Sequence, residues 1–101
     1  MNAIVNNLYP VPNHGSSALK LAAGSTPVSF GDFDSGTRYV LLDITGGDAI
    51  VTFDGSAPAS GNGHVLKKGQ IYTWSKQAAQ AARFVQSTST KANIYASQFT
   101  N

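Results

Sequence analysis

Residues 37–45, TRYVLLDIT, form the most strand-like stretch of this 101-residue chain. Successive side chains of a strand point to opposite faces, so a strand here separates the apolar residues into two sets. One set is Val40, Leu42 and Ile44, and the other is Tyr39 and Leu41. β-Branched and aromatic residues are also enriched in strands. The stretch therefore predicts a strand with apolar side chains on both of its faces.

Short strand-like segments continue on both sides of this stretch. They cover residues 18–24, 27–31, 49–54, 82–87 and 91–99, with two more short extended segments inside 63–74. In the last strand Tyr95, Ser97 and Phe99 share one face. The glycine pair at 46–47, followed by an aspartate, predicts a tight hairpin into 49–54. Further turns are expected at 68–69 and 87–90.

About seven short strands with glycine- and serine-rich turns predict an all-β fold, a small antiparallel β-sandwich or barrel. Only residues 75–82, SKQAAQAA, favour a helix, because alanines and glutamines follow a serine that can cap it. A loop that closes into the next strand fits the same residues. At most one short helix is therefore expected.

The first sixteen residues differ from the rest of the chain, and we expect an extended N-terminal arm at 1–16 and a single β domain at 17–101. Pro10 and Pro12 remove backbone donors and hold the residues before them extended. The arm needs a surface to lie on, either its own domain or a neighbouring subunit, because it carries five large apolar side chains. These are Ile4, Val5, Leu8, Tyr9 and Val11. We expect them to dock on a neighbouring subunit.

The composition favours a protein that assembles with others. Only 12% of the residues are charged and glutamate is absent, while serine, threonine, glycine, asparagine and alanine are abundant. Short polar side chains lose little entropy when a partner covers them. The seven basic residues are scattered and the net charge is +2, so no nucleic-acid partner is indicated. No apolar run approaches the roughly 18 residues of a membrane span, and the start lacks the pattern of a signal peptide.

Catalytic and cofactor chemistry are not indicated, and we expect no catalytic residue, no cofactor and no metal. His14 and His64 are far apart in sequence, and cysteine is absent. Asp32 and Asp34 look like the start of a calcium loop, but Gly36 falls at the fifth place instead of the sixth. A surface turn explains this segment better. The glycines of GNGH, 61–64, are expected to adopt positive φ and not to cradle phosphate.

Tyr72 and Trp74 share one face of a predicted strand. Exposed together, they would form a stacking platform for a sugar or a base; buried, they belong to the core. The core interpretation is favoured because the chain is small and has a single tryptophan.

Residues 37–100 resemble small virion proteins of tailed bacteriophages, described as head decoration (cement) or minor structural proteins. The resemblance rests on VTFDGSAP at 51–58, a loop of small residues, GHVL at 63–66, GQIYTW at 69–74, ARFV at 82–85 and a final alternating strand.

The resemblance implies a non-enzymatic β-sandwich or barrel on a capsid or tail surface, commonly a trimer. We therefore expect a capsid decoration protein, made in the host cytoplasm and placed on the capsid surface of the virion. Its partners would be the major capsid protein and copies of itself, with no nucleic acid and no membrane. A tail or neck component, an adhesion component and a small carbohydrate-binding module remain as alternatives.

Overall fold

The computed structural model describes residues 19–100 of the chain. The predicted arm at 1–16, with its five apolar side chains and His14, lies outside the described residues. The first strand of the described part, β1, covers Leu19–Ala23.

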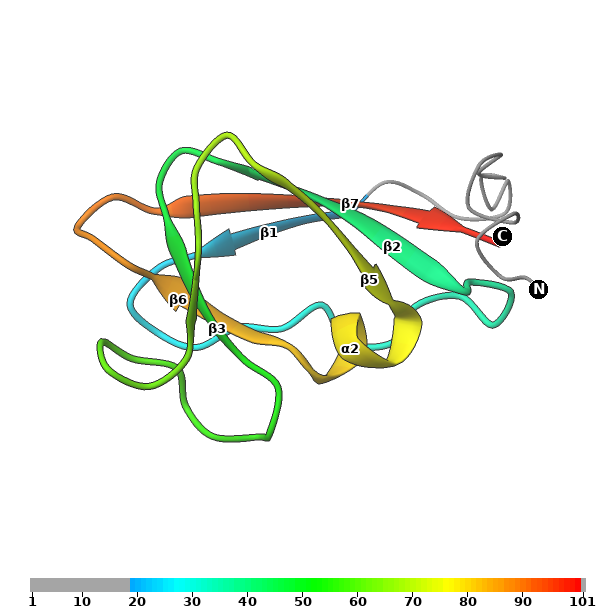
Figure 1. The fold of residues 1–101 in the computed structure, drawn as a ribbon, viewed down its shortest axis with the longest axis horizontal. Helices are drawn as coiled ribbons and strands as arrows, with labels where there is room; N and C mark the ends of the chain where they lie inside the picture. The colour runs from blue at the N-terminus through cyan, green and yellow to red at the C-terminus, as the bar shows by residue number, and fades with distance from the viewer. Residues whose placement is uncertain (1–18, 101) are drawn as a thin grey trace.

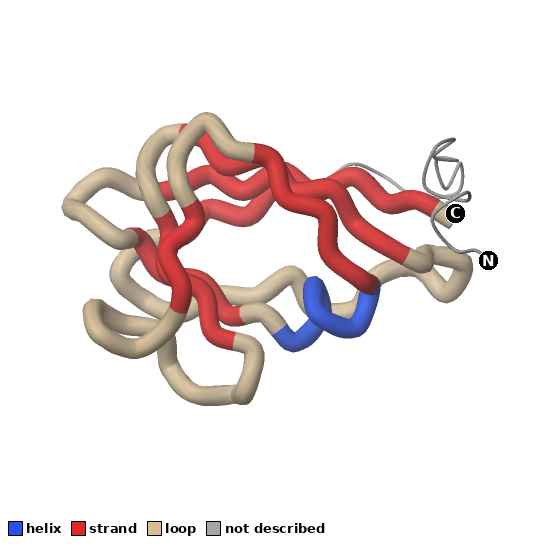
Figure 2. Tube along the Cα trace, in the orientation of Figure 1, coloured by secondary structure: helices blue, strands red, loops and turns tan. Residues whose placement is uncertain are grey.

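Within residues 19–100 seven strands form two antiparallel sheets, so the predicted all-β fold is confirmed (Figure 1). The first sheet has the order β1-β7-β2-β5, with β7 at Ala92–Phe99, β2 at Tyr39–Thr45 and β5 at Ile71–Ser75. The second has the order β4-β3-β6, with β4 at His64–Leu66, β3 at Ala49–Thr52 and β6 at Arg83–Gln86. Figure 2 shows the two sheets as facing layers with the helix α2 (Lys76–Ala81) at one end.

The core lies between the two sheets because the apolar side chains alternate along the strands as predicted. In β2 every second residue is buried, beginning with Val40, and β7 alternates in the same way from Ala92. Phe84 of β6 is the largest fully buried side chain. It forms one buried cluster with Val51 of β3 and with Val40, Leu42, Ile44 and Ile94 on the inner face of the four-stranded sheet.

The segment at 75–82 contains the predicted helix, six residues long. Ser75 caps it, since its Oγ accepts a hydrogen bond from the backbone N–H of Ala78 at 3.2 Å. The helix ends at Ala81, and the next residue, Ala82, has an extended backbone that leads directly into β6. A helix this short is not stable by itself and depends on packing, here through the buried Ala79.

Three sequence predictions about the strands are wrong. No strand forms at 27–31, where Val28 makes only an isolated bridge to Phe84 of β6. The strand predicted at 49–54 ends at Thr52. No hairpin forms at 46–48, because β2 pairs with β5 and β7 and the chain crosses there into the other sheet.

Asp48 organises the end of the sandwich at which the chain crosses between the sheets. Its carboxylate accepts hydrogen bonds from the backbone N–H of Lys68 at 2.8 Å and from the ammonium group of Lys67 at 3.1 Å. Its carbonyl oxygen accepts another from the N–H of Ser87. These bonds hold the pKa of Asp48 below its usual value, the Lys68 N–H first and the Lys67 ammonium second. Through its carboxylate and its backbone carbonyl, this one residue ties together three crossings that are far apart in the sequence.

Candidate interaction surface

The outer face of the four-stranded sheet carries large apolar side chains that no other part of residues 19–100 covers completely. Ile71 is 61% exposed and Tyr95 is 42% exposed. The face comprises alternate residues of the four strands, brought together by the strand register. They are Lys20 and Ala22 of β1, Asn93, Tyr95, Ser97 and Phe99 of β7, Tyr39, Leu41, Asp43 and Thr45 of β2, and Ile71, Thr73 and Ser75 of β5.

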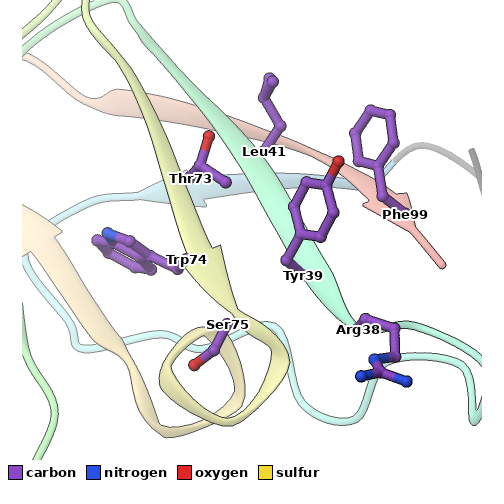
Figure 3. A pocket seen from close by; sticks show the side chains of 7 residues that line it. All are labelled: Arg38, Tyr39, Leu41, Thr73, Trp74, Ser75 and Phe99. Atoms are coloured by element: carbon purple, nitrogen blue, oxygen red, sulfur yellow. The ribbon is translucent and has the colours of Figure 1, made fainter. Parts of the chain in front are cut away.

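One end of this face is an open hollow of about 600 Å³ (Figure 3). Its lining residues are Arg38, Tyr39, Leu41, Thr73, Trp74, Ser75 and Phe99. The rings of Tyr39 and Phe99 stack with their centroids 5.1 Å apart and 7° between their planes. Leu41 and Thr73 lie in the next cross-strand row, while the Ser75 hydroxyl is occupied as the cap of α2. The hollow is therefore mainly apolar and aromatic.

Charge is sparse at the hollow. None of the described residues that line it is acidic, and its only basic residue is Arg38. The guanidinium of Arg38 has no ion-pair partner within residues 19–100, where the only salt bridge joins Lys67 and Asp48. A partner for this end of the face would therefore be apolar or weakly polar.

The rest of the face is more polar. Asp43 lies directly opposite Tyr95, and the ammonium group of Lys20 lies 5.8 Å from the centre of the Tyr95 ring. A cation over an aromatic ring is held by the charge distribution of the ring. The face thus combines an apolar hollow at one end with a mixed polar and aromatic surface beside it, a pattern found in protein–protein interfaces.

Tyr72 and Trp74 lie on the inner face of β5, and the core interpretation is confirmed. The indole stacks on Phe84 at 6.1 Å with 8° between the planes, and Phe53 meets it edge-on at 5.0 Å. The hydroxyl of Tyr72 accepts a hydrogen bond from the backbone N–H of Lys67 at 3.0 Å. In Figure 3 the indole points away from Tyr39 and Phe99. Both aromatic residues are therefore partly buried core residues and not a free platform.

The loop of small residues between β3 and β4 is held by its own hydrogen bonds. The carboxylate of Asp54 accepts from the hydroxyl of Ser56 at 2.6 Å and from its backbone N–H at 3.0 Å. These bonds lower the pKa of Asp54, the hydroxyl contributing most. The amide of Asn62 donates to the carbonyl of Ala57 at 2.8 Å and so closes the loop. The loop is a preorganised tip.

His64 lies at the return of this loop, where its exposed ring is 6.4 Å from that of Phe53. Both residues line a small depression of about 270 Å³ together with Thr52, Asp54, Asn62 and Gly63. The Asp54 carboxylate is bound to Ser56, and no hydrogen bond joins it to the imidazole within the described chain. Gly61 and Gly63 have positive φ, as predicted for GNGH.

Of the two aspartates considered for calcium, Asp34 begins a surface turn in which its carbonyl accepts from the N–H of Thr37 at 3.0 Å, and Asp32 is exposed two residues before it. Over residues 19–100 no three histidine, aspartate or glutamate side chains gather closely enough to hold a metal ion. No helix in this part of the chain has the length and apolar character needed to cross a membrane.

The sequence prediction placed the partner-binding residues in the arm, at Ile4, Val5, Leu8, Tyr9 and Val11, which are outside the described residues. It missed the hollow, although the alternation along 37–45 and 91–99 had already placed Tyr39, Leu41 and Phe99 on the faces that prove to be outer. What was missing was the order of the strands, which places β2 between β7 and β5.

Comparison of the chain with profiles of known protein families, with curated proteins and with solved structures finds no match.

Proposed function

We propose that the protein is a non-enzymatic structural protein of a tailed-phage virion. It would act as a capsid decoration (cement) protein that binds the outer head surface and stabilises it by bridging neighbouring subunits of the major capsid protein. The observation that carries this proposal is the exposed apolar and aromatic outer face of the four-stranded sheet. The resemblance of residues 37–100 to small virion proteins supplies the identity of the partner.

The physical character of the face supports binding to a large protein surface. Ile71 and Tyr95 expose apolar area to water, and covering that area is favourable by about 25 cal/mol per Å². Some of the side chains around them are short, such as Thr73 and Ser97, and these lose little conformational entropy on contact. A shell of many identical copies, each a trimer, multiplies modest contacts through multivalency.

A tail or neck component would use the same kind of face, and the number of copies per particle separates the two locations. A cement protein is present at many symmetric sites on the head, and a neck component at few. The carbohydrate-binding alternative is disfavoured for Tyr72 and Trp74, because Phe84 and Phe53 occupy the surroundings of the indole.

The proposal is tested by sedimentation of the protein with purified phage heads, comparing Ile71→Lys with Val65→Lys. Both side chains are exposed, at 61% and 52%, and both sit on short strands, but Val65 belongs to the other sheet. The expected result is loss of head binding for Ile71→Lys alone, because a charge in a buried interface must be desolvated. Unaltered binding of both variants would contradict use of this face, and absence of binding by the unmodified protein would contradict the head location.

A further inference from the structure

We propose that the hollow at the end of the outer face is the docking site for residues 4–11 of the same chain. The occupant is thus the apolar part of the N-terminal arm, bound to its own domain and not to a second copy. This inference does not depend on the virion role, because it concerns the isolated protein.

The first argument is the place where the described chain begins. Leu19 pairs with Ala96 of β7, which pairs in turn with Leu42 of β2. Phe99 lies three residues after Ala96 in β7 and pairs with Tyr39 of β2. Tyr39 also pairs with Ser75 of β5, so these three residues form one row across the sheet. The hollow therefore occupies the last cross-strand row of the sheet. Since β1 and β7 are antiparallel, the chain that precedes Leu19 comes from the end of the sheet that bears this row.

The second argument is reach. Val11 precedes Leu19 by eight residues, and an extended chain covers about 3.3 Å per residue, or about 26 Å in total. The strands that line the hollow are one to three strands away from β1, about 5–15 Å across the sheet. The excess length is enough for a reversal of direction. Asn13, His14 and Gly15 provide residues suited to a turn, and Pro10 and Pro12 favour an extended segment beyond it.

The third argument is chemical match. Residues 1–16 contain no aspartate, glutamate, lysine or arginine, and residues 4–11 include five large apolar side chains. The hollow presents a stacked aromatic pair and a leucine, with a single cation at its rim. An uncharged apolar segment and a mainly apolar hollow both gain from mutual burial. The docked arm would fill the concave end of the outer face, and its outward side chains would become part of the surface that meets a partner.

The absence of cysteine from the chain makes a cross-linking test direct. Thr73→Cys places one thiol in the hollow, on the exposed side of β5. The second thiol is introduced in the full-length chain by Leu8→Cys or Tyr9→Cys, two adjacent positions that cover both faces of an extended segment. The matched control replaces Thr73→Cys by Val65→Cys, on the other sheet.

We expect an intramolecular disulfide in the Thr73→Cys series, observed as a compact monomer on a non-reducing gel and located by mass spectrometry. Its yield should exceed that of the Val65→Cys series several-fold. Equal yields in the two series overturn the proposal. Disulfide-linked dimers as the main product also overturn it, because they assign the arm to a second copy.

A second measurement does not require the close approach that a disulfide demands. Two proteins that both carry Thr73→Cys are treated with a water-soluble thiol reagent. One has the natural arm, and the other also carries Leu8→Ser and Val11→Ser in the arm. Removal of the apolar side chains should raise the reaction rate of Thr73→Cys several-fold and leave that of Val65→Cys unchanged. An unchanged rate at Thr73→Cys means that the arm does not cover the hollow. Head binding is measured separately, so failure of this inference is distinguishable from failure of the proposed function.

Discussion

Among the glycines of residues 19–100, Gly63 is the one at which an added Cβ would come closest to a neighbouring atom. Its φ is +131°, a conformation that side-chain-bearing residues rarely adopt. A Cβ at this position would lie 2.6 Å from the carbonyl oxygen of Val51 and 2.8 Å from Cγ2 of Ile50. The close approach arises because the chain returns from the loop onto β3 immediately before β4 pairs with it. Gly63→Ala must therefore shift the backbone of a buried strand.

The expected loss of stability for Gly63→Ala has two parts. The unfavourable backbone conformation costs about 1–3 kcal/mol, and relief of an overpacked contact costs about another 1–3 kcal/mol. Gly61 in the same loop is the matched control, because its φ is +85° and a Cβ there would meet nothing within 4 Å. Gly61→Ala should cost only the left-handed backbone term, about 1–2 kcal/mol. The lower entropy of the unfolded chain is common to both alanine variants and cancels in the comparison.

Urea unfolding, followed by the emission of the single tryptophan, measures both variants against the unmodified protein. We expect the free energy of unfolding of Gly63→Ala to lie below that of Gly61→Ala by about 1–3 kcal/mol, most of it from overpacking, because both variants carry a backbone cost of similar size. Equal losses within about 0.5 kcal/mol would refute the close approach. The result matters for the resemblance as well, because Gly63 opens its GHVL segment, and a packing role would mark that segment as structural.

Three other predictions concern the interior and the crossing turns. The Lys68 N–H and the Lys67 ammonium lower the pKa of Asp48, so the ionised carboxylate stabilises the fold above the unfolded pKa of about 4, and this stabilisation is lost as the pH falls further. Asp48→Asn should therefore make the free energy of unfolding fall less steeply with decreasing pH. An unchanged pH profile would contradict this. Gln98→Leu should lower the free energy of unfolding by about 1–3 kcal/mol, because the side-chain carbonyl of Gln98 accepts hydrogen bonds from the buried hydroxyl of Thr37 at 2.8 Å and from the backbone N–H of Asp34. An unchanged melting temperature would show that these two donors find other acceptors. The emission of Trp74 should be blue-shifted and weakly quenched by acrylamide, and a red, easily quenched emission would place the indole outside the core.

The period-two patterns were enough to predict which residues lie on which face, but not which strands are neighbours. The alternation in β2 and β7 is read directly from the sequence, because each strand has one buried face. The glycine pair before Asp48 has the local composition of a hairpin, yet it links two sheets. The deciding interactions are long-range: a Cβ at Gly46 would meet the carbonyl of Lys91 at 2.8 Å. Such long-range contacts cannot be recognised in the local sequence. The hollow cannot be recognised there either, because it forms only when β7, β2 and β5 are neighbours in that order.

β5 connects the folding of the domain with the proposed attachment. Its inner residues, Tyr72 and Trp74, pack toward the core, whereas Ile71 and Thr73 face outward on the candidate surface. Because successive residues point to opposite faces, neighbouring substitutions in this one strand should have separable effects. Changes at Tyr72 and Trp74 should act on stability, and changes at Ile71 and Thr73 on binding with little loss of stability. A one-residue shift in the pairing of β5 with β2 would exchange the two faces, and would therefore impair both folding and the proposed attachment.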